Sequence, residues 1–261
     1  AELMSALYAL IFQETISHKK QWFELFHVIN DVGHAENGLY ALKANYKMAG
    51  LDLDQLKKFR SIESGLTGHG EVHCFPEGVF LSNGPLGSAF PQSQGVALGE
   101  KLNGQNRITV CILSDGAAME GEAKEAFTAI PGLASKSLLG PYVLIISDNN
   151  TKLSGRIDQD SFSMAPTFET LNTLGWEYIK LENGHDLQAC VETIHLAFEK
   201  AKNNPMKPVV IHAKTIKGYG VKKTMESASG GHGFPLKSPT ELADFLSEIY
   251  QNNKYPGVFN S

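Results

Sequence analysis

The fold is decided by the stretch Ile108-Thr109-Val110-Cys111-Ile112-Leu113-Ser114-Asp115-Gly116, where an apolar run ends in small and acidic residues. A short, continuous apolar run rich in β-branched side chains predicts a strand that is buried on both faces. A second such run, Tyr142 to Ile146, follows a helical stretch and leads into Ser147-Asp148-Asn149-Asn150-Thr151. Buried strands that alternate with helices are typical of a parallel sheet, so these runs predict an α/β fold.

Two more runs extend the predicted sheet. They are Trp176 to Ile179 and Pro208 to His212, separated by a helix that follows Asp186 and ends near Asn203. Another helix is predicted from Pro91 to Lys101, since proline is tolerated in the first turn of a helix. No repeat, low-complexity tract or linker interrupts the chain. We therefore predict a single domain over residues 1–261, with a parallel sheet covered by helices on both faces.

The residues before this pattern have helical periodicity. Apolar side chains recur at helical spacing in Leu3, Leu7, Leu10 and Ile11, in Leu39, Leu42 and Tyr46, and from Leu51 to Phe59. The sequence therefore predicts a helical first quarter of the chain. Frequent glycines between Gly65 and Gly104 predict irregular backbone before the helix at Pro91.

The composition is that of a globular protein without a nucleic-acid partner. Of the 261 residues, 42% are hydrophobic, and the formal net charge is -5. No dense run of Lys or Arg offers an electrostatic surface to nucleic acid or an anionic membrane. The most basic stretch holds Lys214, Lys217, Lys222 and Lys223, which fit either a solvated face or a place that holds an anion.

Cysteine usage and hydropathy indicate a cytoplasmic protein. Cys74, Cys111 and Cys190 are odd in number and widely spaced, which fits neither a disulfide framework nor a zinc site. No apolar stretch approaches the roughly 20 residues that span a bilayer, and no export signal opens the sequence. We expect a reducing compartment and no membrane partner.

Polar residues follow both leading strands at the edge where α/β sheets bind ligands. Asp115 and Gly116 precede a helix predicted to begin near Ala117, and such a helix N-terminus attracts phosphate. A carboxylate beside that phosphate requires a cation between them. Asn149 adds an amide oxygen from the neighbouring strand, and oxygen ligands suit Mg²⁺ or Ca²⁺. Asp-Gly and Asn-Asn are also common turn dipeptides, so an ordinary turn explains these residues equally well on their own.

The same residues resemble the cofactor motif of the transketolase family. Transketolases carry Gly-Asp-Gly, a run like Met-Glu-Gly and then Asp-Asn, and this chain has Ser114-Asp115-Gly116, Met119-Glu120-Gly121 and Asp148-Asn149. Further motifs follow in the family's order over nearly the whole chain. They are Gly33-His34-Ala35, Gly68-His69-Gly70-Glu71, Gly84-Pro85-Leu86-Gly87, Gly184-His185-Asp186, Lys214 to Gly220 and His232-Gly233-Phe234-Pro235-Leu236. Several spaced motifs in one order are far more specific than one metal motif.

The resemblance implies the thiamine diphosphate-binding fold, in its pyrophosphate-type form. It implies that Asp115, Asn149 and the backbone carbonyl of Thr151 hold Mg²⁺ (or Ca²⁺), which in turn holds the diphosphate. Gly116 would permit close approach of the phosphates.

Other cofactor contacts are implied on the same basis. Gly84, Pro85 and Leu86 match the place where the family packs the cofactor rings, and an apolar Leu86 suits carbanion chemistry in a dry site. Glu120 matches a family glutamate at the subunit contact, which couples two active sites. A salt bridge on a helix surface is the alternative for Glu120.

Three histidines, His34, His69 and His232, match family histidines that line the substrate channel. Histidines exchange protons with sugar hydroxyls near neutral pH, so we expect catalytic roles for all three. His185 precedes a helix with Asp186 as its N-cap, and a structural role is at least as favoured there. Structural roles are also expected for His18, His27, His73, His195 and His212.

The resemblance further implies a partner. The family's activating glutamate and substrate-phosphate arginines lie on later domains, and the sequence stops before the first of these would begin. We therefore expect the N-terminal subunit of a split transketolase, joined by a separate chain in a heterotetramer and acting on sugars or sugar phosphates. The sequence also opens just past the family's first channel histidine, either because it was trimmed or because the protein lacks that segment.

The implied reaction is transfer of a two-carbon ketol unit from a ketose to an aldose. The α subunit of a 2-oxoacid dehydrogenase is an alternative with the same cofactor, and a catalytically silent regulatory subunit is another. Ser114 in place of Gly, and Ser88-Ala89 in place of Gln-Gly, depart from the family pattern and leave the sugar open.

Overall fold

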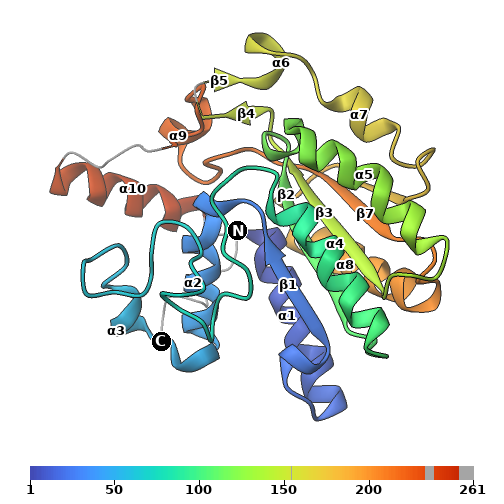
Figure 1. Cartoon of the computed structure of the whole chain (residues 1–261). Coiled ribbons are helices and arrows are strands. Elements are labelled where there is room, and N and C mark those ends of the chain that lie inside the picture. The colour runs from blue at the N-terminus through green and yellow to red at the C-terminus, as the bar shows by residue number, and fades with distance from the viewer. Residues whose placement is uncertain (154, 233–237, 253–261) are drawn as a thin grey trace. The chain divides into compact units, whose positions relative to one another are not determined.

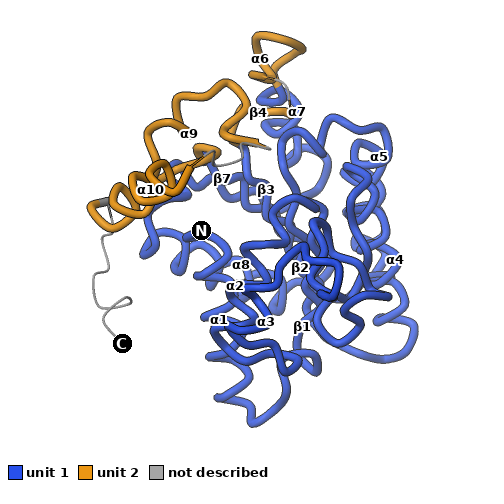
Figure 2. The backbone as a smooth tube through the Cα atoms, turned by 90° about the vertical axis from the view of Figure 1, so that its left-hand side faces the viewer, with its two compact units in different colours: residues 1–148, 164–215 blue, residues 149–163, 216–261 orange. Residues whose placement is uncertain are grey.

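The computed structural model describes residues 1–153, 155–232 and 238–252. The chain forms two compact units (Figure 2). Unit 1 consists of Ala1–Asp148 and Met164–Thr215, and unit 2 consists of Asn149–Ser163 and Ile216–Ser261. The organisation as a single domain stays a prediction.

A parallel sheet is the centre of unit 1 (Figure 1). Its five strands within the described residues follow the order β1-β2-β3-β7-β6. They are β1 (Phe26–Asn30), β2 (Ile108–Ser114), β3 (Tyr142–Asp148), β6 (Glu177–Leu181) and β7 (Val209–Lys214). The four strands predicted from apolar runs are confirmed, with bounds that differ by a few residues.

The edge strand β1 corrects the prediction of a wholly helical first quarter. Phe26 pairs with Ile108 and Asn30 with Ile112, so β1 takes all its pairing from a strand far along the sequence. A five-residue strand carries too short a pattern to be distinguished from the helices around it. Leu51–Phe59 likewise forms only one helical turn, α3 (Leu53–Leu56).

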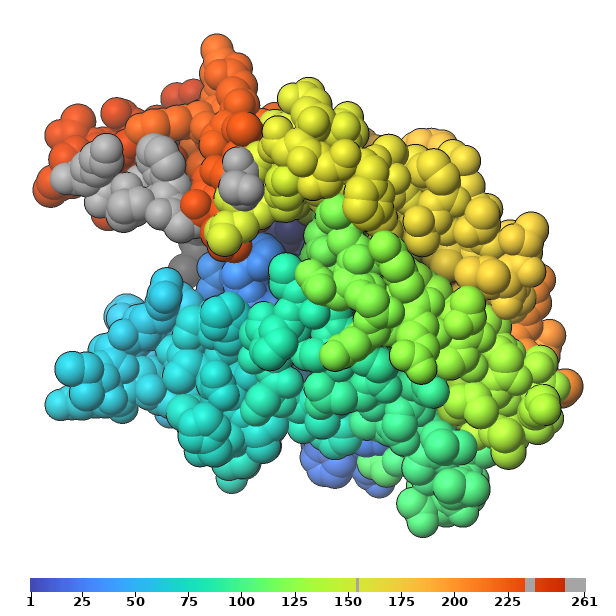
Figure 3. Space-filling view, turned by 45° about the horizontal axis from the view of Figure 1, so that its top comes forward, coloured from blue at the N-terminus to red at the C-terminus, as the bar shows by residue number. Residues whose placement is uncertain are grey.

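Helices cover both faces of the sheet, as predicted (Figure 1). On one face, α1 (Glu2–His18) and α8 (Leu187–Asn203) share a core with the strands, in which Leu7, Ile11 and Phe198 are buried. On the other face, α4 (Ala89–Leu102) packs on α5 (Gly121–Ala134), and the outer surfaces of these two helices adjoin (green in Figure 3). The rings of Phe90 and Phe127 lie 5.2 Å apart between them.

Helix starts show how local sequence acts. The carboxylate of Asp186 accepts a hydrogen bond from the Ala189 N–H at 3.1 Å, which confirms the predicted N-cap of α8. Pro91 lies in the first turn of α4, also as predicted. The helix predicted near Ala117 is wrong in its start, because Ala117–Met119 forms a 3-10 turn and α5 begins at Gly121. Glu120 has an extended backbone that separates the two.

The remaining elements are short. Unit 1 also contains 3-10 turns η1 (Trp22–Glu24), η2 (Gly33–Ala35) and η3 (Met48–Gly50), with helices α2 (Glu36–Asn45) and α7 (Ala165–Glu169). Unit 2 contains β4 (Thr151–Lys152), β5 (Gly155–Arg156), α6 (Ile157–Asp160), α9 (Lys222–Glu226) and α10 (Pro239–Asn252). Among the described helices, none is long and apolar enough to cross a membrane.

Candidate functional site

Asp115 lies at the carboxyl end of β2, inside unit 1. Asp115 is only 1% exposed. Its Oδ1 accepts a 2.9 Å hydrogen bond from the Gly116 N–H. The hydroxyl of Ser114 accepts a hydrogen bond from the Ala117 N–H at 3.1 Å and so caps the 3-10 turn. A buried carboxylate at a strand end, beside a glycine, is therefore built into the edge of the sheet where ligands bind in α/β proteins.

The turn Asn83-Gly84-Pro85-Leu86-Gly87 packs against the segment that follows Asp115. Gly84 and Gly87 have φ values of 135° and 76°, which favour glycine over any residue with a Cβ atom. A Cβ atom on Gly87 would lie 2.7 Å from Cβ of Glu120 and 3.0 Å from the Ala117 carbonyl oxygen. Leu86 projects outward and is 47% exposed, although it is a large apolar side chain.

His69 lies at the other side of the same turn. A Cβ atom on Gly33 would lie 2.6 Å from Cδ2 of His69 and 3.1 Å from the backbone nitrogen of Gly84. The predicted segments around His34, His69 and Gly84 therefore meet within unit 1. Both histidines are exposed, which leaves their rings accessible to a ligand.

At the end of β3, the carboxylate of Asp148 is hydrogen-bonded to other side chains of unit 1. His212 Nε2 lies 2.6 Å from Asp148 Oδ2, Lys214 donates to the same oxygen, and the Tyr178 hydroxyl lies 2.6 Å from His212 Nδ1. Burial alone would raise the pKa of Asp148, but the hydrogen bonds from His212 and Lys214 outweigh it and lower the pKa. These contacts give His212 a structural place, as the sequence predicts.

Asn149 and Thr151 lie in unit 2, where Asn149 follows the end of β3 and Thr151 is the first residue of β4. The Thr151 hydroxyl donates to the Asn149 carbonyl oxygen at 3.0 Å and accepts from Arg156 at 2.8 Å. Asn150 between them has φ 55°, a left-handed conformation that asparagine tolerates. The predicted metal ligands are thus divided between the units, with Asp115 in unit 1.

His232 is also in unit 2, where its Nδ1 lies 2.9 Å from Nζ of Lys217. The rest of its motif, residues 233–236, lies outside the described residues. His185, in unit 1, lies 3.4 Å from Glu2 and precedes the Asp186 cap, which fits a structural role. Of the predicted basic cluster, Lys222 and Lys223 pair with Glu226 and Glu241, and Lys214 pairs with Asp148.

Comparison with known protein families identifies the family of this chain. The family described as transketolase, thiamine diphosphate binding domain, matches residues 2–248. The chain belongs to the transketolase family. This confirms the predicted family, and with it a thiamine diphosphate-binding domain built on a parallel sheet with helices.

Individual transketolases agree with this membership. The chain is 34% identical over 227 residues to the transketolase of Staphylococcus epidermidis, covering 83% of this chain and 32% of that protein. It is 32% identical over 243 residues to the transketolase of Geobacillus stearothermophilus, covering 88% of this chain and 34% of that protein. The chain therefore spans about a third of the length of these transketolases.

Solved structures show the same fold. The transketolase of Leishmania mexicana matches with a TM-score of 0.64 and 25% identity, over 87% of this chain and 36% of that one. The R525L mutant of the Pichia stipitis transketolase matches with a TM-score of 0.66 and 23% identity, over 90% of this chain and 37% of that one.

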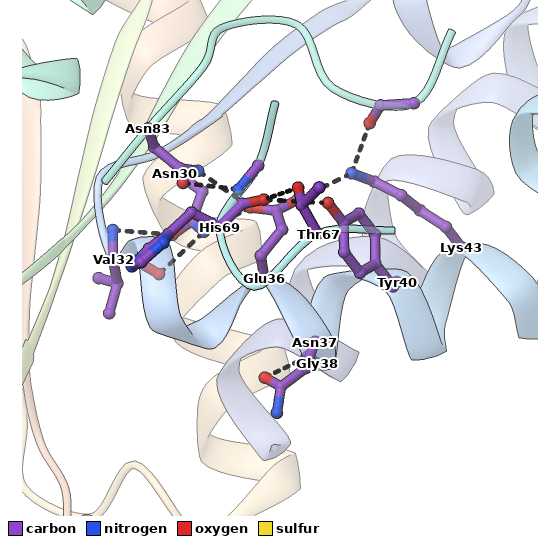
Figure 4. A network of polar contacts seen from close by, with 12 residues as sticks. Asn30, Val32, Glu36, Asn37, Gly38, Tyr40, Lys43, Thr67, His69 and Asn83 are labelled. Carbon is purple, nitrogen blue, oxygen red and sulfur yellow. Dashed lines mark hydrogen bonds and ion pairs between the residues drawn. The ribbon is translucent and has the colours of Figure 1, made fainter. Parts of the chain in front are cut away.

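The transketolase motifs did not reveal two buried acids beside the site, Asp31 and Glu36. Asp31 directly follows β1 and accepts hydrogen bonds from the Gly87 and Phe90 N–H groups, each at 2.8 Å. Burial raises the pKa of Asp31, although these backbone N–H groups partly oppose the shift. Glu36 opens α2, and its carboxylate contacts Asn30, Lys43 and Asn83 (Figure 4).

A sequence signal for Glu36 exists in retrospect. Glu36, Leu39, Tyr40 and Lys43 share one face of a helix, at the spacing i, i+3, i+4 and i+7. All four are buried. An acid and a base on an otherwise apolar helix face indicate a paired buried charge. Asp31 has no comparable signal, because its hydrogen-bond donors lie 56 and 59 positions away.

Proposed function

We propose that this chain binds thiamine diphosphate with Mg²⁺ and serves an enzyme that transfers a two-carbon ketol unit from a ketose to an aldose. The observation that carries the proposal is the meeting of Asp115, the glycine turn at Gly84 and the loop of His69 within one unit of a transketolase-family domain. The turn contacts the segment after Asp115 on one side and His69 on the other.

The donor set fits the diphosphate and its metal. Asp115 supplies a buried carboxylate, Asn149 an amide oxygen and Thr151 a backbone carbonyl, and Mg²⁺ prefers such hard oxygen ligands. Ca²⁺ accepts the same ligand types. Gly116 leaves room for phosphate oxygens next to the N-terminal turn at Ala117. Among the described residues, no group of three or more His, Cys, Asp or Glu side chains competes as a metal site.

The apolar turn suits the cofactor rings. When bound, thiamine diphosphate would supply the nucleophilic carbon that ketol transfer needs. Gly84 and Pro85 would shape the floor beneath the rings, and Leu86 would cover an apolar ring face that is otherwise costly to expose to water. Exclusion of water also protects a carbanion from protonation by solvent.

His34, His69 and His232 are proposed to hold and move protons at the sugar. A neutral imidazole accepts a proton from a hydroxyl, and an imidazolium donates to a developing alkoxide. Glu120 is proposed to lie at a subunit contact. Glu120 is exposed and packs on Gly87. It would therefore link such a contact to the turn from Asn83 to Gly87, which we call the cofactor turn.

The activating glutamate is proposed to come from a separate C-terminal transketolase subunit in the cytoplasm, with two copies of each chain. Sugars or sugar phosphates are the proposed substrates. The chain's match to about a third of the length of related transketolases supports the idea of a further part.

The experiment is calorimetric titration of thiamine diphosphate, in the presence of Mg²⁺, into the assembled enzyme. Binding by the wild type and its loss in Asp115→Ala are expected, while equal binding by both would refute the metal assignment. A ketose-donor assay and a pyruvate-oxidation assay on the same sample then separate ketol transfer from a 2-oxoacid dehydrogenase. Cofactor binding without either activity would indicate a silent subunit and contradict the proposed reaction.

A further inference from the structure

The turn from Asn83 to Gly87 has no regular structure of its own, yet it touches both His69 and Glu120. A segment outside helices and strands keeps one conformation only if other groups hold it. Two buried carboxylates meet its two ends: Asp31, directly after β1, and Glu36, the first residue of α2.

Glu36 meets the first end. Its Oε2 accepts hydrogen bonds from the side-chain amides of Asn30 at 2.8 Å and Asn83 at 3.0 Å (Figure 4). The residue is only 2% exposed, so these bonds form where water does not compete. Asn83 is thereby fixed to the start of α2.

Asn83 passes this restraint to the loop of His69. Its Oδ1 accepts a 2.8 Å hydrogen bond from the Gly70 N–H, one residue after His69. The packing is close, because a Cβ atom on Gly70 would lie 2.9 Å from Asn83 Nδ2 and 3.0 Å from Glu36 Oε2. The side-chain amide of Asn83 therefore joins Glu36, the cofactor turn and the loop that contains His69.

Lys43 balances the charge of Glu36. Its Nζ lies 3.4 Å from Glu36 Oε1 and donates to the Gly78 carbonyl oxygen at 2.6 Å. Burial lowers the pKa of Lys43, and the nearby Glu36 opposes that shift. Removal of either partner alone would leave a buried charge without its counter-charge, which is strongly destabilising.

Asp31 meets the second end. Its Oδ1 accepts from the Gly87 N–H and its Oδ2 accepts from the Phe90 N–H, which also engages the N-terminus of α4. The residue is 0% exposed. A carboxylate is favoured at a helix N-terminus, so Asp31 fixes both the end of the turn and the start of the helix.

We infer that Glu36 and Asp31 are positioning residues that hold the cofactor turn from both ends and thereby set the distance between His69 and Leu86. The inference rests on the proposed function for its catalytic consequence. It assigns no catalytic step to either acid, since both carboxylates are hydrogen-bonded to other groups of the protein.

The test compares two double variants of the assembled enzyme that both lack the buried charge pair. Glu36→Gln with Lys43→Met keeps a carbonyl oxygen for the amides of Asn30 and Asn83. Glu36→Ala with Lys43→Met removes that oxygen. Glu36 lines a cavity of ≈ 20 Å³, which has room for about one water. The two variants thus differ mainly in the hydrogen bonds from Asn30 and Asn83 to position 36.

Two readouts separate positioning from folding. Amide hydrogen exchange at Gly70, measured without cofactor, is expected to be at least about tenfold faster in the alanine variant. With cofactor and substrates, kcat is expected to be roughly tenfold to a hundredfold lower in the alanine variant, with rescue in the glutamine variant. Equal exchange and equal kcat in the two variants would overturn the inference, whatever their melting temperatures.

Asp31 is tested with Asp31→Asn, which keeps one acceptor oxygen but turns an amide N–H₂ toward the second backbone N–H. Faster exchange of the Gly87 or Phe90 N–H is expected, with a severalfold rise in the Kd of thiamine diphosphate. Unchanged exchange at both positions would overturn the role of Asp31. If the wild type binds no thiamine diphosphate, the proposed function fails, while the exchange results still decide whether the acids hold the turn.

Discussion

Gly33 is in direct contact with His69, 36 positions further along the chain. A Cβ atom on Gly33 would lie 2.6 Å from His69 Cδ2, and real Cβ atoms essentially never come that close to another atom. Gly33 precedes His34 and Gly68 precedes His69, so a glycine stands directly before each of these two predicted channel histidines. The relationship explains why a residue with no side chain stands before His34.

Gly33→Ala is therefore expected to displace His69 with little effect on folding. Gly33 has no positive φ, so alanine suits its backbone. The new Cβ would meet His69 most closely, at 2.6 Å, and would lie 3.0 Å from Asn83 Oδ1 and 3.1 Å from the backbone nitrogen of Gly84, so these two need to shift by only a few tenths of an ångström. We expect kcat to fall by about tenfold to a hundredfold, with the Kd of thiamine diphosphate changed less than about threefold. Gly38→Ala is the matched control, since its Cβ would meet only Met4 Sδ at 3.5 Å, and it should retain wild-type kcat.

Gly87→Ala is expected to destabilise the fold, which Gly33→Ala is not, and the cause does not involve a histidine. The residue has φ 76°, and its Cβ would lie 2.7 Å from Cβ of Glu120. Left-handed strain and the clash together should lower the free energy of unfolding by about 1–3 kcal/mol, measured by urea denaturation. Gly99→Ala, inside α4 with nothing within 4 Å of the new atom, should instead raise it by about 0.5–1 kcal/mol.

Asp115→Asn is expected to abolish metal-dependent stabilisation by the cofactor. Wild-type enzyme with thiamine diphosphate and Mg²⁺ at about 100 times the Kd should gain about 2.7 kcal/mol of stability, and a chelator should remove it. The variant should show neither the gain nor the response to the chelator, since a neutral amide binds Mg²⁺ weakly. Glu122→Gln, an exposed change in the first turn of α5, serves as the control. A chelator-sensitive gain in Asp115→Asn equal to that of the wild type would contradict the assignment.

Glu100 gives unit 1 a predictable response to acid. Burial alone would raise the pKa of Glu100, but hydrogen bonds from Arg107 at 2.6 and 2.7 Å, together with the nearby His27 ring, outweigh it and lower the pKa. A carboxyl with a lowered pKa stabilises the fold above its ordinary value of 4.5, and this contribution is lost as the pH falls below it. Burial also lowers the pKa of His27 below its ordinary value of 6.5. The fold therefore loses stability as the pH falls below 6.5, because the unfolded chain binds a proton at His27 more readily.

The measurement is urea denaturation of wild type and Glu100→Gln from pH 7 down to pH 3. At pH 7 the variant should be less stable by about 1–3 kcal/mol, because the bidentate bond to Arg107 is lost. The gap should narrow as the wild-type carboxyl becomes protonated. A gap that is constant over this range would show that the charge of Glu100 contributes nothing.

Local sequence was sufficient for much of the architecture. The apolar runs at Ile108, Tyr142 and Pro208 became buried strands, because a run of that kind is stable only between two helical layers. Asp186 capped α8, since a cap depends on residues only three positions away. The ordered motifs likewise pointed to the transketolase family without any knowledge of contacts.

Tertiary structure decided what holds the candidate site in place. β1 exists because Ile108–Ile112 offers it hydrogen-bond partners, and no local periodicity announces such a pairing. Asp31 and Glu36 carry no family motif, and their roles arise from donors 47 to 59 positions away, at Asn83, Gly87 and Phe90. Sequence alone indicated the groups that we propose for the chemistry, because their types and order are local properties of the chain. Only the folded chain decided how these groups are held, because buried hydrogen bonds between distant segments form after the sheet has brought the segments together.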